Sequence, residues 1–250
     1  MSARLGIGLG VGVLIAGVAA WPRGATDAAG DPGPCPEGMA RVDASLCIDR
    51  YEASLDELDD AGAVVRGHPP NEPVGARRVR AKSVRGVVPQ AYVSRDDADG
   101  ACRAAGKRLC TDDEWRRACR GTHATKYPYG TRRRAGTCND RGVEPLAVVF
   151  RRPASATEWG FDTMNDPRLH LVPGGVARTG RFDRCTNDLG IYDMVGNVHE
   201  WTSDPAGTFR GGWYLDTSEL GEGCDYAAVG HDAKYRDYST GFRCCRDVAE

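Results

Sequence analysis

The sequence predicts a loop-rich domain that is held together by disulfides and contains only a few short helices and strands. Its 250 residues include 32 glycines and 14 prolines, and the mean hydropathy is -0.46, which favours irregular segments over a helical bundle. Ten cysteines, an even number, follow an apolar N-terminal stretch. In an oxidising compartment this predicts five disulfides and no free thiol. A chain of this length can bury a core as one large domain or two small ones.

The N-terminal residues carry the features of an export signal. Residues 1–20 contain one charged residue, Arg4, followed by an apolar stretch over 5–20 that suits a signal peptide and is short for a membrane span. Small residues at 18–20, or Ala25, offer cleavage sites, and the alternative is an uncleaved N-terminal anchor. Residues 21–34 are rich in Pro and Gly and predict a linker. We therefore expect one folded domain over 35–250 outside the cytoplasm, periplasmic or secreted, with membrane contact only through the N-terminal segment.

Two short helices give the clearest local signals. Ser94 and Asp97 form a capping box, after which Ala98, Ala101 and Cys102 recur at helical spacing, and Gly106 is placed to end the helix. A second capping box predicts a helix over 112–120, which begins at Thr111, buries Trp115, Ala118 and Cys119, and ends before Gly121.

The remaining segments predict little regular structure. Residues 35–54 favour a short hairpin or meander. Residues 55–90 predict a long surface excursion with one strand near Pro73 and Val74, and the chain after residue 121 is irregular. The net charge of -2 favours neither nucleic acid nor an acidic membrane surface as a partner.

The stretch DMVGNVHEWTSD, residues 193–204, contains the first candidate site. His199 and Glu200 do not form a zinc-protease motif, because Ser203 stands where the second histidine would be needed. Asp193 and Glu200 are seven residues apart with Gly196 between them, which supplies the hard oxygen ligands that calcium prefers. The alternative is a metal-free turn.

The order of several motifs resembles the formylglycine-generating enzyme family, also called the sulfatase-modifying factor family. From about Cys35 to Cys245 the chain contains CIDRYEAS, SRDDADGACRAAGKRLCTDDEWRRACRG, YPYG, CND, GIYDMVGNVHEWTSD, FRGGWY and GFRCC. The resemblance implies a single α+β domain of the formylglycine-generating-enzyme fold, which is related to C-type lectins and has little regular secondary structure.

The resemblance also implies two disulfides and a calcium loop. The implied pairs are Cys102–Cys244 and Cys119–Cys224, and for the remaining cysteines we propose Cys110–Cys245, Cys138–Cys185 and Cys35–Cys47. The implied ligands of a structural calcium ion are Asp193, the carbonyl oxygens of Gly196 and Val198, and Glu200. Asn139 and Asp140 match the start of a second calcium site.

The catalytic positions of the family are altered. The family's reaction, which converts a sulfatase cysteine to an aldehyde, depends on two cysteine thiolates that hold Cu(I), and in this sequence those positions fall on Asp216 and Gly221. Trp213 replaces a serine. Because Cu(I) prefers sulfur to carboxylate ligands, we expect no bound copper and no catalytic residue at these positions. Cys224 is no substitute, because its spacing matches the disulfide partner of Cys119.

Two functions remain open, and the sequence does not decide whether the chain is an enzyme. One is a calcium-stabilised binding module for an unknown protein or glycan. The alternative is a divergent oxidoreductase that modifies a sulfatase cysteine or another protein substrate, with Asp216, Asp225, His231 and Asp232 as candidates for a hard-metal or acid–base role. The plainer interpretation of these four residues is a solvated acidic loop.

Overall fold

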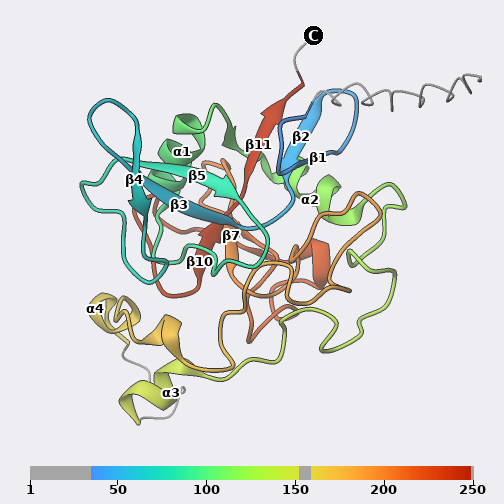
Figure 1. Ribbon diagram of the computed structural model, residues 1–250. Coiled ribbons are helices and arrows are strands. Elements are labelled where there is room, and N and C mark those ends of the chain that lie inside the picture. The colour runs from blue at the N-terminus through green and yellow to red at the C-terminus, as the bar shows by residue number, and fades with distance from the viewer. Residues whose placement is uncertain (1–34, 152–158, 249–250) are drawn as a thin grey trace, which may run out of the picture. The chain divides into compact units, whose positions relative to one another are not determined.

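Three small sheets form the framework of the protein (Figure 1). The computed structural model describes residues 35–151 and 159–248, so the predicted signal peptide or anchor and the predicted linker lie outside the described residues. The described residues all belong to one compact unit. None of their helices is long and apolar enough to cross a membrane.

The first sheet brings the two ends of the domain together. Its order is β1-β2-β11-β6, and all its pairs are antiparallel. The strands are β1 (Met39–Arg41), β2 (Leu46–Asp49), β6 (Arg108–Leu109) and β11 (Cys244–Asp247). Strand β11 lies between β2 and β6, so the last strand of the chain is central to this sheet.

The candidate loop leads into the second sheet, and the third sheet contains the longest strand of the described residues. One has the order β10-β7-β8-β9, with β7 and β10 parallel, and comprises β7 (His199–Trp201), β8 (Phe209–Arg210), β9 (Ala227–Ala228) and β10 (Thr240–Phe242). The other has the order β4-β3-β5 and comprises β3 (Ala53–Leu58), β4 (Val64–Gly67) and β5 (Val79–Ser83).

The two predicted helices are confirmed, together with their caps. Helix α1 (Arg95–Ala104) begins at Ser94, whose hydroxyl accepts a hydrogen bond from the N–H of Asp97 at 3.1 Å. Helix α2 (Asp112–Arg120) begins at Thr111, whose own N–H donates to Glu114 at 2.8 Å. Gly106 has a φ of 68°, a left-handed conformation that favours glycine after a helix.

The prediction for residues 55–90 is wrong in part. No strand forms at Pro73 and Val74, and instead β4 and β5 flank β3 in a three-stranded sheet. In β5, Val79 and Ala81 are buried against α1, while Arg80 and Lys82 alternate with them on the other side. The buried side chains of this strand recur at every second residue, and the charged residues between them made that alternation hard to recognise in the sequence.

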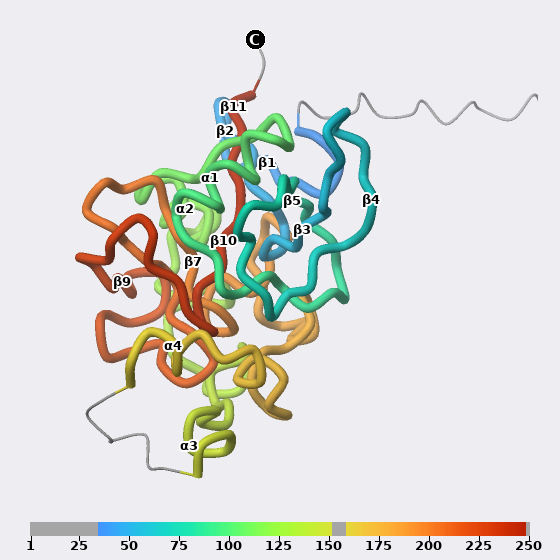
Figure 2. The backbone as a smooth tube through the Cα atoms, turned by 90° about the vertical axis from the view of Figure 1, so that its left-hand side faces the viewer, coloured from blue at the N-terminus to red at the C-terminus, as the bar shows by residue number. Residues whose placement is uncertain are grey.

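Short helices also appear in the segment that was expected to be irregular. They are α3 (Pro145–Phe150), α4 (Phe161–Met164) and the 3-10 helices η1 (Leu169–Leu171) and η2 (Gly223–Asp225). Pro145 at the first position of α3 is preorganised for a helix, and the Glu144 carboxylate accepts from the N–H of Leu146 at 3.1 Å. Figures 1 and 2 both place α3 and α4 at the end of the domain opposite β2 and β11.

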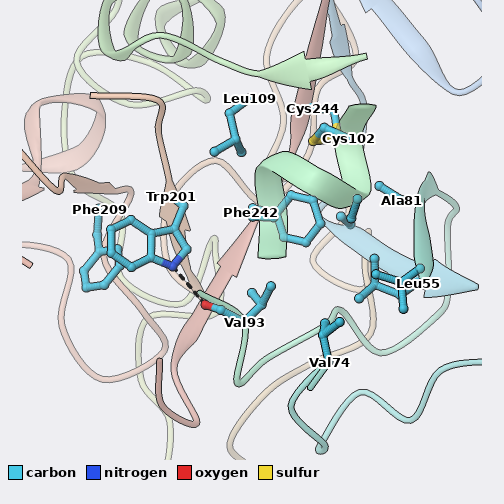
Figure 3. Packing of buried hydrophobic residues seen from close by; sticks show 14 of the residues in the cluster. Leu55, Val74, Ala81, Val93, Cys102, Leu109, Trp201, Phe209, Phe242 and Cys244 are labelled. Atoms are coloured by element: carbon cyan, nitrogen blue, oxygen red, sulfur yellow. Dashed lines mark hydrogen bonds between the residues drawn. A yellow bond between two sulfur atoms is a disulfide. The ribbon is translucent and has the colours of Figure 1, made fainter. Parts of the chain in front are cut away.

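The core lies between α1 and the sheets that contain β3 and β7. Leu55, Val93 and Phe242 are almost fully buried there. Figure 3 shows the indole of Trp201 directed at the carbonyl oxygen of Val93, to which it donates a hydrogen bond of 2.9 Å. This bond fixes a large aromatic ring immediately after Glu200.

Five disulfides join all ten cysteines. The pairs are Cys35–Cys47, Cys102–Cys244, Cys110–Cys245, Cys119–Cys224 and Cys138–Cys185, the same five that the sequence analysis set out. Cys244 and Cys245 reach different partners because successive side chains of a strand point to opposite faces. Cys244 belongs to the core beside α1, and Cys245 to the core beside α2. Five disulfides are typical of proteins in an oxidising, extracytoplasmic environment.

Candidate functional site

The loop before β7 has a strained backbone. Asp193 and Asn197 have φ angles of 59° and 62°, a left-handed conformation that costs most side chains about 1–3 kcal/mol. Gly196 also has a positive φ, and a Cβ there would lie 2.1 Å from the carbonyl oxygen of Asn139. Only glycine fits at this point, so the close approach of the segments at 139 and 196 depends on it.

Glu200, at the centre of β7, is held by two buried donors. Its Oε2 accepts hydrogen bonds from Trp115 Nε1 and Arg243 Nε, both at 2.6 Å, and its Oε1 accepts from Arg243 Nη2 at 2.7 Å. The side chains of Glu200 and Arg243 are at most 1% exposed. Arg243 also donates to the carbonyl oxygens of Asp49 and Tyr192. The guanidinium therefore links β7 to β2 and to the start of the loop.

Two further buried carboxylates, those of Asp193 and Glu52, interact electrostatically with Glu200 and Arg243. Asp193 accepts from the N–H of Gly180 at 2.6 Å, and burial raises its pKa to about 6. Glu52 accepts from Asn197 Nδ2 at 2.6 Å and from the N–H of Val198 at 3.2 Å. Burial, and then the charges of Asp193 and Glu200, raise the pKa of Glu52 well above its usual value. With all groups ionised, the three carboxylates outnumber the guanidinium groups that act on them, Arg243 and, at Asp193, Arg85, which leaves a net negative charge.

The donor chemistry of this loop fits a divalent cation. Asp193 and Glu200 offer hard oxygen atoms, and a doubly charged ion would balance the surplus. In the described part of the chain no three His, Cys, Asp or Glu side chains converge as a metal site, so side chains alone do not complete a ligand set. The carbonyl oxygens of Gly196 and Val198 would have to contribute, and Glu200 would share its carboxylate between the ion and Arg243.

Asn139 and Asp140 have protein partners in this structure. Asn139 Nδ2 donates to the carbonyl oxygen of Gly175 at 3.0 Å and to Asn197 Oδ1 at 2.9 Å. Asp140 accepts from Arg133 at 3.1 Å and from the N–H of Gly136 at 2.7 Å. Asn139 thus braces the loop before β7 at Asn197.

The segment at the family's copper positions forms tight turns. The N–H of Trp213 donates to the carbonyl oxygen of Asp216 at 2.8 Å, and the N–H of Asp216 donates back at 3.1 Å. Asp216 Oδ1 accepts from the N–H groups of Ser218 and Glu219. At Gly221, φ is 115° and a Cβ would lie 2.7 Å from the carbonyl oxygen of Asp225. The backbone at 221 therefore disfavours any residue with a side chain, cysteine included.

Aromatic rings fill the space beside this segment. Trp213 packs against His199, Tyr214 and Tyr238, with ring centroids 4.9–6.0 Å apart. His199 Nδ1 lies 3.2 Å from Ser239 Oγ, and its Nε2 lies 3.3 Å from the hydroxyl of Tyr226. Burial lowers the pKa of His199 to about 3, so its ring stays neutral near pH 7. His199 acts as a packing residue within a hydrogen-bonded chain.

The acid–base candidates do not gather around a common point. Asp225 forms an ion pair with Arg120 on α2, and Asp232 is exposed and accepts from the N–H of Lys234. His231 packs on Phe209, with ring centroids 4.2 Å apart, and burial lowers its pKa. His199 and Tyr226 interact electrostatically with Asp216. Sequence reasoning missed Tyr226, and also Glu52 and Arg243, which stand inside two quoted motifs, CIDRYEAS and GFRCC.

Comparison with known proteins places the chain in a family. The model of the sulfatase-modifying factor enzyme 1-like domain matches residues 22–248. The formylglycine-generating enzyme of Mycobacterium tuberculosis is 33% identical over 115 residues, which cover 46% of this chain and 33% of that protein. The inactive C-alpha-formylglycine-generating enzyme 2 of Mus musculus is 31% identical over 141 residues, which cover 53% of this chain and 39% of that protein.

The matched region therefore spans well under half the length of these relatives. Among solved structures, PvdO from Pseudomonas aeruginosa aligns with a TM-score of 0.46 and 16% identity over 81% of this chain and 80% of that one. Because the family model extends over all of the described residues, the chain belongs to the sulfatase-modifying factor enzyme 1-like domain family.

Proposed function

We propose that this chain is a non-catalytic binding module that acts outside the cytoplasm and recognises a protein or a glycan. One observation carries the proposal: all ten cysteines are joined in disulfides, and the copper positions hold Asp216 and Gly221. A carboxylate is a poor ligand for Cu(I), and the backbone at 221 leaves no room for a thiol side chain. A relative named as inactive, with 31% identity, supports the same conclusion.

A calcium ion bound at the loop before β7 completes the proposal. Asp193, Glu200 and the carbonyl oxygens of Gly196 and Val198 would hold it. Its charge would balance the buried carboxylates, and its chemistry would be structural, since a calcium ion bound in this way cross-links a loop without taking part in a reaction. The loop would then keep β7 and the adjoining turns in place for ligand binding.

The alternative is a divergent oxidoreductase that modifies a cysteine in a sulfatase or in another protein. The similarity to a formylglycine-generating enzyme at 33% identity favours it. In that case Asp216, whose charge acts on Tyr226 and His199, would be the group in this segment that contacts the substrate.

An activity assay separates the two functions. The full chain is incubated with Cu(I), oxygen and a peptide of the Cys-x-Pro-x-Arg type, and the aldehyde product is sought by mass spectrometry. An active formylglycine-generating relative in parallel shows that the assay works. We expect product from the relative and none from this chain. Turnover by this chain that Asp216→Ala abolishes would establish the oxidoreductase instead.

A further inference from the structure

A basic hollow lies beside β5, away from the segment at the copper positions. Its volume is about 550 Å³, which is within the range of small-ligand sites. One side is formed by residues 80–85, which comprise most of β5 and the turn after it. The other side is formed by Glu37 and Gly38 before β1, and by Ala105 and Lys107 after α1. A Cβ at Gly38 would lie 2.9 Å from the carbonyl oxygen of Ser83, so the two sides meet closely there.

Four of the lining residues are cationic and one, Glu37, is anionic, and two of the cationic residues form no ion pair in the described structure. Lys82 pairs with Asp56 at 2.5 Å, and Lys107 pairs with the buried Asp49 at 2.6 Å. Within the described residues, the side chain of Arg80 makes no hydrogen bond or ion pair. Arg85 likewise forms no ion pair there, although its charge acts on the buried carboxylate of Asp193. The chain as a whole has a net charge of -2, so this local excess of positive charge is not a property of the whole surface.

Arg85 is held in place by uncharged contacts. Its guanidinium lies 5.4 Å from the centroid of the Tyr192 ring and donates to the carbonyl oxygen of Gly180 at 3.3 Å. Tyr192 in turn stacks on Tyr51, with ring centroids 5.2 Å apart. A guanidinium that is positioned by uncharged contacts, with no ion pair of its own, keeps donors available for the oxygen atoms of a carboxylate, sulfate or phosphate group.

The lining favours a sugar over a peptide. Peptide recognition usually relies on apolar or aromatic anchors that enter pockets, and the apolar residues of this hollow are only Ala81, Val84 and Ala105. Cationic side chains and the close backbone of Gly38 instead suit a hydrated, oxygen-rich ligand. The volume matches a short oligosaccharide.

We infer that this hollow binds a short anionic oligosaccharide, with Arg80 and Arg85 contacting its sulfate or carboxylate groups. The inference rests on the proposed function as a binding module and names the class of its ligand. The copper and peptide assay tests the module itself, so failure of sugar binding and failure of the proposed function are distinguishable.

The test measures the affinity of the full chain for a labelled sulfated glycosaminoglycan tetrasaccharide. A non-sulfated tetrasaccharide that contains uronic acid and a neutral tetrasaccharide separate the contributions of sulfate and carboxylate. We expect the sulfated sugar to bind, the neutral sugar not to bind, and the affinity to fall as salt is raised. Arg80→Gln should weaken binding about tenfold, the effect of one charge-assisted contact, and Arg80→Gln with Arg85→Gln should weaken it further.

The matched control is Arg116→Gln on α2, which makes the same charge change at a residue that does not line this hollow. Its affinity should equal that of the unaltered chain. Because Arg80 has no partner, Arg80→Gln should retain the melting temperature, so loss of binding is not loss of the fold. Equal losses in Arg80→Gln and Arg116→Gln would overturn the site. A polyglutamate peptide that binds as well as the sugar would overturn the ligand class.

Discussion

The guanidinium of Arg243 balances part of the buried negative charge beside the candidate calcium loop. It is the only cation that pairs with Glu200 in the described structure, and Glu52 and Asp193 also sense its charge. Arg243→Met would keep much of the side-chain volume and leave Glu200 buried without its counter-ion. Loss of one partner from a buried ion pair destabilises proteins by about 3–5 kcal/mol. We expect a loss of this size in the free energy of unfolding, measured with urea under non-reducing conditions.

Arg246→Met supplies the control for that substitution. Arg246 lies three residues further along the chain and is exposed. Its replacement should change the free energy of unfolding by less than about 0.5 kcal/mol. If the two variants were equally stable, the ion pair between Glu200 and Arg243 would not support the fold as argued.

His170 should make stability depend on pH. Burial lowers its pKa to about 4, against 6.5 for an exposed histidine, so the folded protein keeps this ring neutral. Below about pH 6.5 the unfolded chain takes up a proton that the folded chain does not. The contribution of His170 is therefore complete above pH 6.5 and is lost as the pH falls towards 4. The shift corresponds to about 3 kcal/mol.

The measurement compares free energies of unfolding at pH 7 and pH 4.5 for the unaltered chain and for His170→Leu. Taking the difference between the two proteins cancels the titration of other groups, among them Asp193, whose raised pKa acts in the opposite direction. We expect the variant to lose less stability on acidification. His123→Leu changes an exposed histidine and should behave as the unaltered chain. Parallel curves for all three proteins would contradict the argument.

Helix α2 begins at a capping box that is visible in the sequence, and it packs one face into the core. Thr111 and Glu114 close its first turn reciprocally, and its buried face carries Trp115, which contacts Glu200. Thr111→Ala should cost about 1 kcal/mol, because the N–H of Glu114 loses the side-chain hydroxyl that accepts its hydrogen bond. Thr131→Ala, at an exposed threonine outside any helix or strand, is the control and should be neutral. Urea unfolding of both variants measures the difference, and equal stability would show that the cap is dispensable.

Over the complete chain, local signals and the disulfide pairings could be predicted, whereas the buried ion pair between distant residues could not. The caps at Ser94 and Thr111 depend on neighbours within three residues, so the sequence displays them directly. Strand β5 was missed because Arg80 and Lys82 masked an alternation of only five residues. The partnership of Glu200 with Arg243 joins residues 43 positions apart, and no spacing rule announces it. The family resemblance was enough to identify the loop before β7 in the sequence. Its counter-charge, Arg243, could be identified only from the structure.

Calcium should stabilise the whole domain if the loop before β7 binds it. Calcium at a hundred times its dissociation constant would add about 2.7 kcal/mol, and for a domain of this size that corresponds to a rise in melting temperature of roughly 5–10 °C. Scanning calorimetry after mild chelation, and again after calcium is restored, measures the shift. Magnesium at the same concentration should restore less, because it demands stricter octahedral geometry.

Two variants assign that shift to the loop. Asp193→Ala removes a proposed ligand and should abolish the difference between the chelated and calcium-loaded protein. Asp232→Ala, at an exposed carboxylate, should leave the difference intact. Metal analysis of the protein before chelation should find calcium in the unaltered chain and in Asp232→Ala, and not in Asp193→Ala. A melting temperature that does not respond to chelation would mean that Arg243 and protonation of the buried carboxylates balance the charge without any metal ion.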